Sequence, residues 1–161
     1  MEIIFAVFIF IVIVGLFWKV LPIFESNEDK IDDVLFEARS LSETLMSKGV
    51  PEEWNTSNVI RPGIIEKNMI ASEEKLRKFY NLSNQNYTLT KNSFGMNSDF
   101  AVYIKNQKGS VVTIEGEKTA GTPKTGFVGG ELNITGEHIV KLERTFIYKN
   151  DPVKMVVFTW Q

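Results

Sequence analysis

The pattern of apolar and polar positions divides the chain into an apolar head, an amphipathic segment and a polar body. From Ile3 to Trp18, no side chain is charged or strongly polar. The apolar run continues to Phe24 with Lys19 as its only interruption. A helix of about 22 residues is about 33 Å long, which matches the hydrocarbon core of a bilayer. We therefore expect residues 1–24 to form an apolar helix that spends time in a membrane and then packs against copies of itself.

Several side chains of this head suggest how it would pack. Trp18 suits the aromatic belt of a membrane interface, and Lys19 can extend its ammonium group toward the headgroups. Gly15 would allow a second backbone to approach closely, although an ordinary membrane-helix glycine is an equal interpretation. Pro22 would kink the helix. The residues that we expect to form the filament-core or membrane helix contacts are Glu2, Phe5, Phe8, Phe10, Gly15, Trp18 and Pro22.

Two other interpretations of the head fit less well. A secretory signal has a shorter apolar region, a basic flank before it and a small-residue cleavage site after it. This chain opens with Met1-Glu2, and the acidic stretch from Glu25 to Lys30 follows the apolar run. A buried helix of a globular protein would carry polar residues on one face, whereas this head is apolar on every face.

The amphipathic segment, residues 25–48, continues the head without a Gly/Ser/Pro linker. Apolar residues recur at steps of three and four, as on one face of a helix. Gly49 and Pro51 predict its end. We expect one helix of about 45 residues, bent near Pro22. The expected apolar stripe comprises Ile31, Val34, Leu35, Ala38, Leu41, Leu45 and Met46, and the expected polar face comprises Asp32, Asp33, Glu37, Arg39, Ser42, Glu43 and Lys48.

The body, residues 49–161, is expected to be an extracellular globular domain. Its second half alternates apolar and polar residues with the period of β-strands. We expect two hairpins, 100–105 with 110–115 and 138–148 with 153–160, a short or edge strand at 133–135, a loop at 116–130, a short helix at 73–80 capped by Ser72, and a helical turn at 89–94. The predicted fold class is α+β, with about four antiparallel strands packed against residues 31–46 of the long helix.

Charge and composition exclude several functions. The net charge is −2 and no cluster of Lys or Arg occurs, which disfavours nucleic acid as a partner. The chain has no cysteine, so disulfides and thiolate metal sites are absent. His138, beside Glu137, is the only histidine, and no nucleophile is placed to partner it. We expect no catalytic residue, no metal site and no cofactor.

Short motifs outside the head were weighed in the same way. Four Asn-x-Ser/Thr sequons mark possible glycosylation sites on an extracellular surface, although chance can also produce such motifs. The glycine-rich stretch 126–130 resembles a fragment of a phosphate loop but lacks the Gly-Lys-Ser/Thr that would complete it. A loop is the better interpretation. The four sequon asparagines are Asn55, Asn81, Asn86 and Asn133.

The start Glu2-Ile-Ile-Phe-Ala-Val-Phe-Ile-Phe10 resembles the mature N-terminus of archaeal type IV pilin-like proteins. The stretches 45–54, 58–63, 74–82 and 154–160 are also similar to such proteins, as loose patterns. In that family a peptidase removes a short basic leader, and the membrane-held subunit then joins a bundle of like helices. By this resemblance, Glu2 would offset the N-terminal ammonium group of a neighbouring subunit, whereas a residue at the membrane edge is the plainer interpretation. No leader is visible before Glu2, which departs from the pattern.

Two functions of different classes follow. The resemblance implies a structural subunit of an extracellular filament that serves in adhesion or surface attachment. Its partners would be copies of itself, the membrane before assembly, a prepilin peptidase and the pilus assembly machinery. The alternative is a single-pass, membrane-anchored extracellular binding domain that does not polymerise. The two differ in whether the apolar head ends in protein or in lipid.

Overall fold

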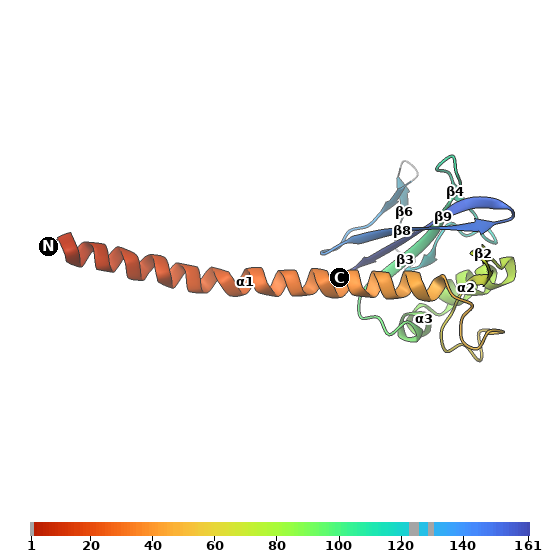
Figure 1. Ribbon diagram of the computed structural model, residues 1–161, viewed down its shortest axis with the longest axis horizontal. Helices are drawn as coiled ribbons and strands as arrows, with labels where there is room; N and C mark the ends of the chain where they lie inside the picture. Colours follow the sequence, from red (N-terminus) through yellow and green to blue (C-terminus); the bar gives the residue numbers. More distant parts are fainter. Residues whose placement is uncertain (1, 123–125, 129–130) are drawn as a thin grey trace. The chain divides into compact units, whose positions relative to one another are not determined.

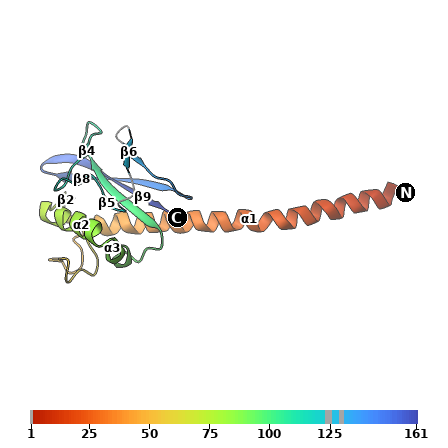
Figure 2. The same cartoon turned by 180° about the vertical axis from the view of Figure 1, so that it is seen from behind.

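The computed structural model describes residues 2–122, 126–128 and 131–161. The side-chain surroundings of Glu2, residues 20–29, Val128 and Glu131 lie outside the described residues. The fold is mixed α/β, with an N-terminal helix and a curled multi-stranded sheet (Figures 1 and 2). The chain separates within the helix into two compact units, Met1–Asp33 and Val34–Gln161.

Helix α1 spans Glu2–Leu45, 44 residues, and its backbone stays helical at Pro22. The side chain of Pro22 lies outside the described residues, and the bend expected there stays a prediction. Within the described part of the chain, no helix has both the length and the apolarity that a membrane crossing requires.

The end of α1 lies where Gly49 and Pro51 predict it, within a few residues. Gly49 has a φ of 84°, a left-handed conformation that glycine adopts without strain. A side chain at Gly63 would collide with the backbone at Ser47 and Gly49, so the returning chain passes close to the helix end. The indole nitrogen of Trp54, which is fully buried, donates to the carbonyl of Gly63 over 2.9 Å. This packing fixes the turn after the helix.

The region after this turn is more ordered than its many turn residues suggested. The predicted helix at 73–80 is present and longer, and the oxygen of its N-cap Ser72 accepts a hydrogen bond from the backbone of Lys75. The predicted turn at 89–94 is a short helix. Two short strands were not predicted. The elements are β1 (Ile65–Lys67), β2 (Ile70–Ala71), α2 (Glu73–Gln85) and α3 (Tyr87–Ser93).

Both predicted hairpins are present, but the sheet is larger than expected. It has seven strands in the order β1-β2-β8-β9-β3-β4, with β5 also paired to β3. It is not purely antiparallel, because β2 pairs with β8 in parallel at Ile70 and Ile147. The expectation of about four antiparallel strands was therefore wrong in number, and its direction was wrong only for the β2–β8 pairing, since the other pairings of the described strands are antiparallel. The remaining strands are β3 (Asp99–Lys105), β4 (Val111–Val112), β5 (Ala120–Gly121), β6 (Gly126–Val128), β7 (Glu131–Asn133), β8 (Val140–Tyr148) and β9 (Asp151–Trp160).

The central strands β3 and β9 are buried on both faces. One face joins the main core, to which Phe100, Val102 and Ile104 belong. In Figures 1 and 2, α2, α3 and the last turns of α1 lie on one side of this sheet. The other face carries a second cluster that includes Tyr103. The ring of Tyr103 meets Phe127 of the two-stranded sheet β6–β7 at a centroid distance of 5.2 Å. Because both faces of β3 are buried, apolar and polar residues alternate little along this strand.

The expectation of a loop over 116–130 was wrong at Ala120–Gly121 and Gly126–Val128, which are strands, while residues 116–119 and 122 lie outside any strand. Ala120 and Gly121 pair with β3, and Gly126–Val128 pairs with Glu131–Asn133. Glycine lowers the intrinsic preference for strand, but neighbouring strands supply hydrogen-bond partners that override it. Gly121, with a φ of 116°, leaves no room for a side chain beside the carbonyl of Phe100.

Candidate functional site: the apolar surface of helix α1

The described part of the apolar head, Ile3–Lys19, is solvent-exposed on every side. Exposed fractions of its large apolar side chains range from 38% at Val14 to 80% at Ile3. The aromatic residues that the sequence analysis selected are also exposed, with Phe5 at 72%, Phe8 at 65%, Phe10 at 67% and Trp18 at 77%. Glu2 and the side chain of Pro22 lie outside the described residues, so their predicted roles stay predictions.

Gly15 lies in the middle of this surface. A side chain added there would meet nothing within 4 Å. The protein's own fold therefore does not require glycine at this position. A close approach at Gly15 would have to come from another molecule, and its packing role stays a prediction.

This surface can bury area against another apolar phase and can do little other chemistry. Soluble monomers rarely expose contiguous apolar patches larger than a few hundred Å². This stretch of helix has no polar face that could be turned toward water while the apolar side chains are covered.

The last part of the helix, within Val34–Gln161, is covered by the sheet and helices of its own unit. Val34, Ala38, Leu41 and Leu45 are at most 1% exposed, which confirms this part of the predicted stripe. The hydroxyl of Thr159, on β9, donates to the carbonyl of Val34 over 3.2 Å. The core of this unit is thus complete without help from another molecule along these turns.

Two side chains of the helix, Ser42 and Ile31, depart from the predicted faces, and Phe36 had been assigned to neither face. Ser42, expected on the polar face, is fully buried, and its oxygen accepts a hydrogen bond from Nε of Arg144 over 3.3 Å. Ile31, expected in the stripe, is 44% exposed. Phe36 is 73% exposed, an isolated aromatic on the outer side of α1. The sheet covers a narrower arc of the helix than the three-and-four spacing suggested.

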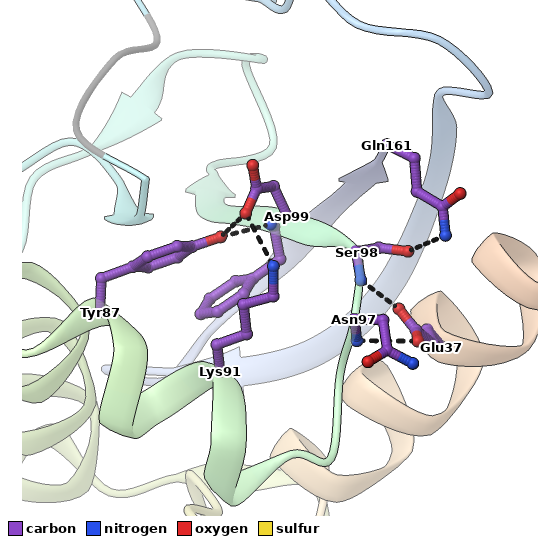
Figure 3. A network of polar contacts seen from close by, with 8 residues as sticks. Glu37, Tyr87, Lys91, Asn97, Ser98, Asp99 and Gln161 are labelled. Atoms are coloured by element: carbon purple, nitrogen blue, oxygen red, sulfur yellow. Dashed lines mark hydrogen bonds and ion pairs between the residues drawn. The ribbon is translucent and has the colours of Figure 1, made fainter.

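Glu37 anchors the chain that enters β3 to this part of the helix, a role that sequence reasoning missed (Figure 3). Its two carboxylate oxygens accept hydrogen bonds from the backbone N–H groups of Asn97 and Ser98, at 2.9 and 2.8 Å. The side-chain amide of Gln161 donates to the hydroxyl of Ser98 over 3.4 Å. A glutamate at a helical polar position gives no sequence signal for such a contact, because its partners lie about 60 residues away.

Asp99 centres the second half of the network in Figure 3. Its Oδ1 accepts hydrogen bonds from the hydroxyl of Tyr87 at 2.9 Å and from Nζ of Lys91 at 3.0 Å. The backbone of Phe100 donates to the oxygen of Tyr87 over 3.0 Å. Burial raises the pKa of the Tyr87 hydroxyl, so the hydroxyl stays protonated and acts as a donor. The network has the character of a structural brace between α3 and β3.

The four sequons lie in different environments. The side-chain oxygen of exposed Asn55 accepts a hydrogen bond from Ser57, and that of exposed Asn86 accepts one from Leu89. Both use the oxygen, whereas a glycan attaches to the amide nitrogen. Asn133 is exposed on β7. The nitrogen of half-buried Asn81 instead donates to Glu115 over 2.9 Å.

These environments rank the sequons as glycan acceptors. Asn81 lies within α2, and the serine of its sequon, Ser83, is fully buried. We expect glycans at two or more of the four sequons, with Asn81 left bare. Intact-mass measurement and site mapping of native material check this expectation. A mass equal to the bare polypeptide would remove it.

Nothing in the described residues gathers into a reactive constellation. The residues that the structure describes hold no cluster of three His, Cys, Asp or Glu side chains able to bind a metal ion. His138, expected to begin a strand, precedes β8 in a left-handed turn with a φ of 50°. A groove of about 350 Å³ beside the turn after β3 is lined in part by Glu143 of β8 and Lys154 of β9, which pair with each other at 3.0 Å.

Comparisons with known proteins add no family to this picture. The chain matches no protein-family model, no curated protein and no solved structure. The resemblance to archaeal type IV pilin-like proteins therefore depends on the stretches quoted from the sequence.

Proposed function

We propose that this chain is a structural subunit of an extracellular filament of the type IV pilus kind. It polymerises through its N-terminal apolar helix and serves in adhesion or surface attachment. A prepilin peptidase would process the membrane-inserted precursor, and the pilus assembly machinery would then assemble it through this helix. The resemblance of the first residues to archaeal pilin-like proteins supports this sequence of events.

The observation that carries the proposal is the apolar surface of Ile3–Lys19. Its large apolar side chains are exposed around the whole helix. If roughly 20 head residues each bury about 50 Å² of apolar surface, the gain relative to water is on the order of 25 kcal/mol. Relative to lipid the gain is far smaller, since lipid tails are apolar too. Transfer from membrane to filament therefore needs an assembly machinery to drive it.

The continuity of α1 favours a filament over a tethered domain. The helix runs without interruption from Glu2 to Leu45, and Val34–Leu45 is built into the globular unit's core. A simple tether needs only a flexible connection between anchor and domain. A filament needs each globular unit held firmly by the helix that packs in the core. A continuous helical backbone between head and globular unit serves the second purpose and is unnecessary for the first.

The test replaces an apolar side chain in the middle of the head by a charge. In a filament core, an unpaired ammonium group would be buried at a cost of several kcal/mol per subunit. We expect Phe10→Lys to abolish filaments sheared from the surface of producing cells. Phe10→Leu is the matched control and should leave filament yield close to that of the wild type, because it keeps the position apolar.

The outcomes separate the two candidate functions. Loss of filaments with Phe10→Lys, while the protein still reaches the membrane, supports polymerisation through the head. Unchanged filament yield with the lysine present would contradict it. If the wild-type chain is found only in the membrane fraction and never in sheared filaments, the anchored binding domain replaces the filament subunit.

A further inference from the structure

The groove of about 350 Å³ lies on the sheet face that also carries Tyr103. Successive side chains of a strand point to opposite faces, so Lys105, two residues after Tyr103, projects from the same face. The strand register places Lys105 opposite Lys154 of β9, and Lys154 opposite Thr145 of β8. All three side chains line the groove. Two lysines and a hydroxyl thus form one row across β3, β9 and β8.

The two lysines of this row repel each other, because like charges directly opposite on neighbouring strands destabilise a sheet. Among the described residues that line the groove, Glu143 is the one acid. Its carboxylate is shared, since one oxygen lies 3.0 Å from Nζ of Lys154 and the other 3.5 Å from Nζ of Lys141. The described lining therefore has an excess of positive charge, on a chain whose net charge is −2. An anionic group in the groove would offset the repulsion.

The turn after β3 adds uncharged groups that both donate and accept hydrogen bonds. Asn106 and Gln107 line the groove. The side-chain oxygen of Asn106 accepts hydrogen bonds from the backbone of Lys108 and Ser110, at 3.0 and 2.9 Å, which holds the side chain in place. Amide and hydroxyl groups match the hydroxyls of a sugar, which also donate and accept. Exposed Pro152 adds an apolar surface for the C–H groups of a sugar ring.

We propose that this groove binds a carboxylated sugar, such as a uronic acid unit of a surface polysaccharide. The carboxylate lies between the ammonium groups of Lys105 and Lys154, where it forms charge-assisted hydrogen bonds. The ring hydroxyls meet Asn106, Gln107 and Thr145. The inference rests on the proposed function, because it names the chemical class that an adhesive subunit would hold.

An acidic peptide fits the groove less well. Extended peptides commonly gain affinity by adding a strand to a free sheet edge. Here β9 is paired with β8 on one side and with β3 on the other, so the groove lies over the face of paired strands. Main-chain recognition of a peptide is therefore unavailable on this face, whereas a sugar is recognised through its hydroxyls and carboxylate.

Titration of a fluorescent galacturonate oligomer with the full-length protein in uncharged detergent tests the ligand class. We expect saturable binding by fluorescence anisotropy. The methyl ester of the same oligomer lacks the charge and should bind at least about tenfold more weakly. A glutamate oligomer with the same number of carboxylates should also bind more weakly than the sugar. Absence of saturable binding to galacturonate, or equal binding of the ester, overturns the proposal. Equal or tighter binding of the glutamate oligomer overturns the sugar as the ligand.

Substitutions locate the binding in the groove. Lys105→Gln and Lys154→Gln keep a long polar side chain and should each weaken galacturonate binding at least about fivefold. Lys67→Gln is the matched control, because Lys67 is exposed on β1 and does not line the groove. It removes the same charge and should stay within about twofold of the wild type, since distant exposed charges are screened. Equal weakening by all three variants would mean diffuse attraction of a polyanion and overturns the groove as the site.

Sheared-filament yield distinguishes this failure from failure of the proposed function. Wild-type filaments that form without binding galacturonate overturn the groove proposal and leave the filament subunit standing. Absence of wild-type filaments would instead remove the proposed function, on which the adhesive role of the groove rests.

Discussion

Two stretches of helix α1 differ in what covers them. Ile3–Lys19 is apolar around the whole helix and exposed, whereas Val34–Leu45 is apolar on one stripe and buried within its own unit. A helix with one apolar stripe can complete its burial against a single sheet. A helix that is apolar on every side exposes apolar surface on every side unless partners surround it. The second stretch contributes to the core of its own unit, and association through the first is what the proposed function adds.

Truncation should separate the two stretches most clearly. Removal of residues 1–24 is expected to leave a soluble, folded monomer, because Val34, Ala38, Leu41 and Leu45 are covered by their own unit. Removal of residues 1–40 should abolish folding, because it takes away Val34, Ala38 and the Glu37 contacts. The lost burial and the lost hydrogen bonds together contribute more than about 5 kcal/mol to the free energy of unfolding, a large share of the stability of a small domain. Light scattering and thermal unfolding followed by circular dichroism measure both. Aggregation of the shorter truncation would contradict the comparison.

Leucine truncation sharpens the same contrast at single positions. Leu41→Ala should lower the free energy of unfolding by about 2–5 kcal/mol, because Leu41 is 1% exposed in the core. Leu16→Ala, measured in detergent, should change the stability of the globular unit by less than about 0.5 kcal/mol, because Leu16 is 60% exposed. Denaturant titration measures both variants. Equal losses would show that the two stretches do not differ in role.

The Glu37 contacts give the next largest effect. Glu37→Ala leaves the backbone N–H groups of Asn97 and Ser98 without their carboxylate, and we expect a loss of about 2–3 kcal/mol. Glu37→Gln keeps one acceptor oxygen and should lose about half as much. Arg39→Ala, an exposed position two residues on, is the matched control and should stay within about 0.5 kcal/mol. If Arg39→Ala destabilises as much as Glu37→Ala, the anchoring role is wrong.

The smallest expected effect is a pH dependence at Glu115. The hydrogen bond from Asn81, with the charge of Arg77, lowers the pKa of the Glu115 carboxyl. Because the folded pKa lies below the unfolded one, the stabilisation is present above the unfolded pKa and is lost as pH falls through the folded pKa. Glu115→Gln should therefore reduce slightly the stability difference between pH 7 and acid. An unchanged difference, measured by denaturant titration at both pH values, would contradict the assignment.

Sequence patterns predicted the elements that depend on residues close to one another in the chain. The three-and-four spacing over 25–48 placed α1 and its buried positions Val34 to Leu45, and Gly49 placed its end. Ser72 placed the start of α2, and period-two alternation placed β8 and β9. Each of these signals depends on neighbours within a few residues. The sequence alone likewise gives the apolar character of Ile3–Trp18 and the positions of the sequons.

Contacts between distant residues escaped prediction. The short strands β1, β2, β5 and β6 exist because partner strands supply hydrogen bonds, not because their sequences favour strand. Ser42 and Glu37 were placed with the polar face, and folding brings Arg144 to the oxygen of Ser42 and the backbone of Asn97 and Ser98 to Glu37. The burial of Ser83 behind Asn81 likewise depends on what α2 packs against.

The sequence by itself determined that one stretch of helix α1 is apolar on every side and another is apolar on one stripe. A side chain's hydrophobicity and its angular position on a helix are local properties. It determined the absence of cysteine chemistry and the scarcity of charge in the head. Tertiary structure alone decided where burial begins along the helix, between Asp33 and Val34, because that boundary lies where the sheet starts to cover it. It also decided which carboxylate anchors β3, since Glu37 meets Asn97 and Ser98 only after about 60 intervening residues have folded.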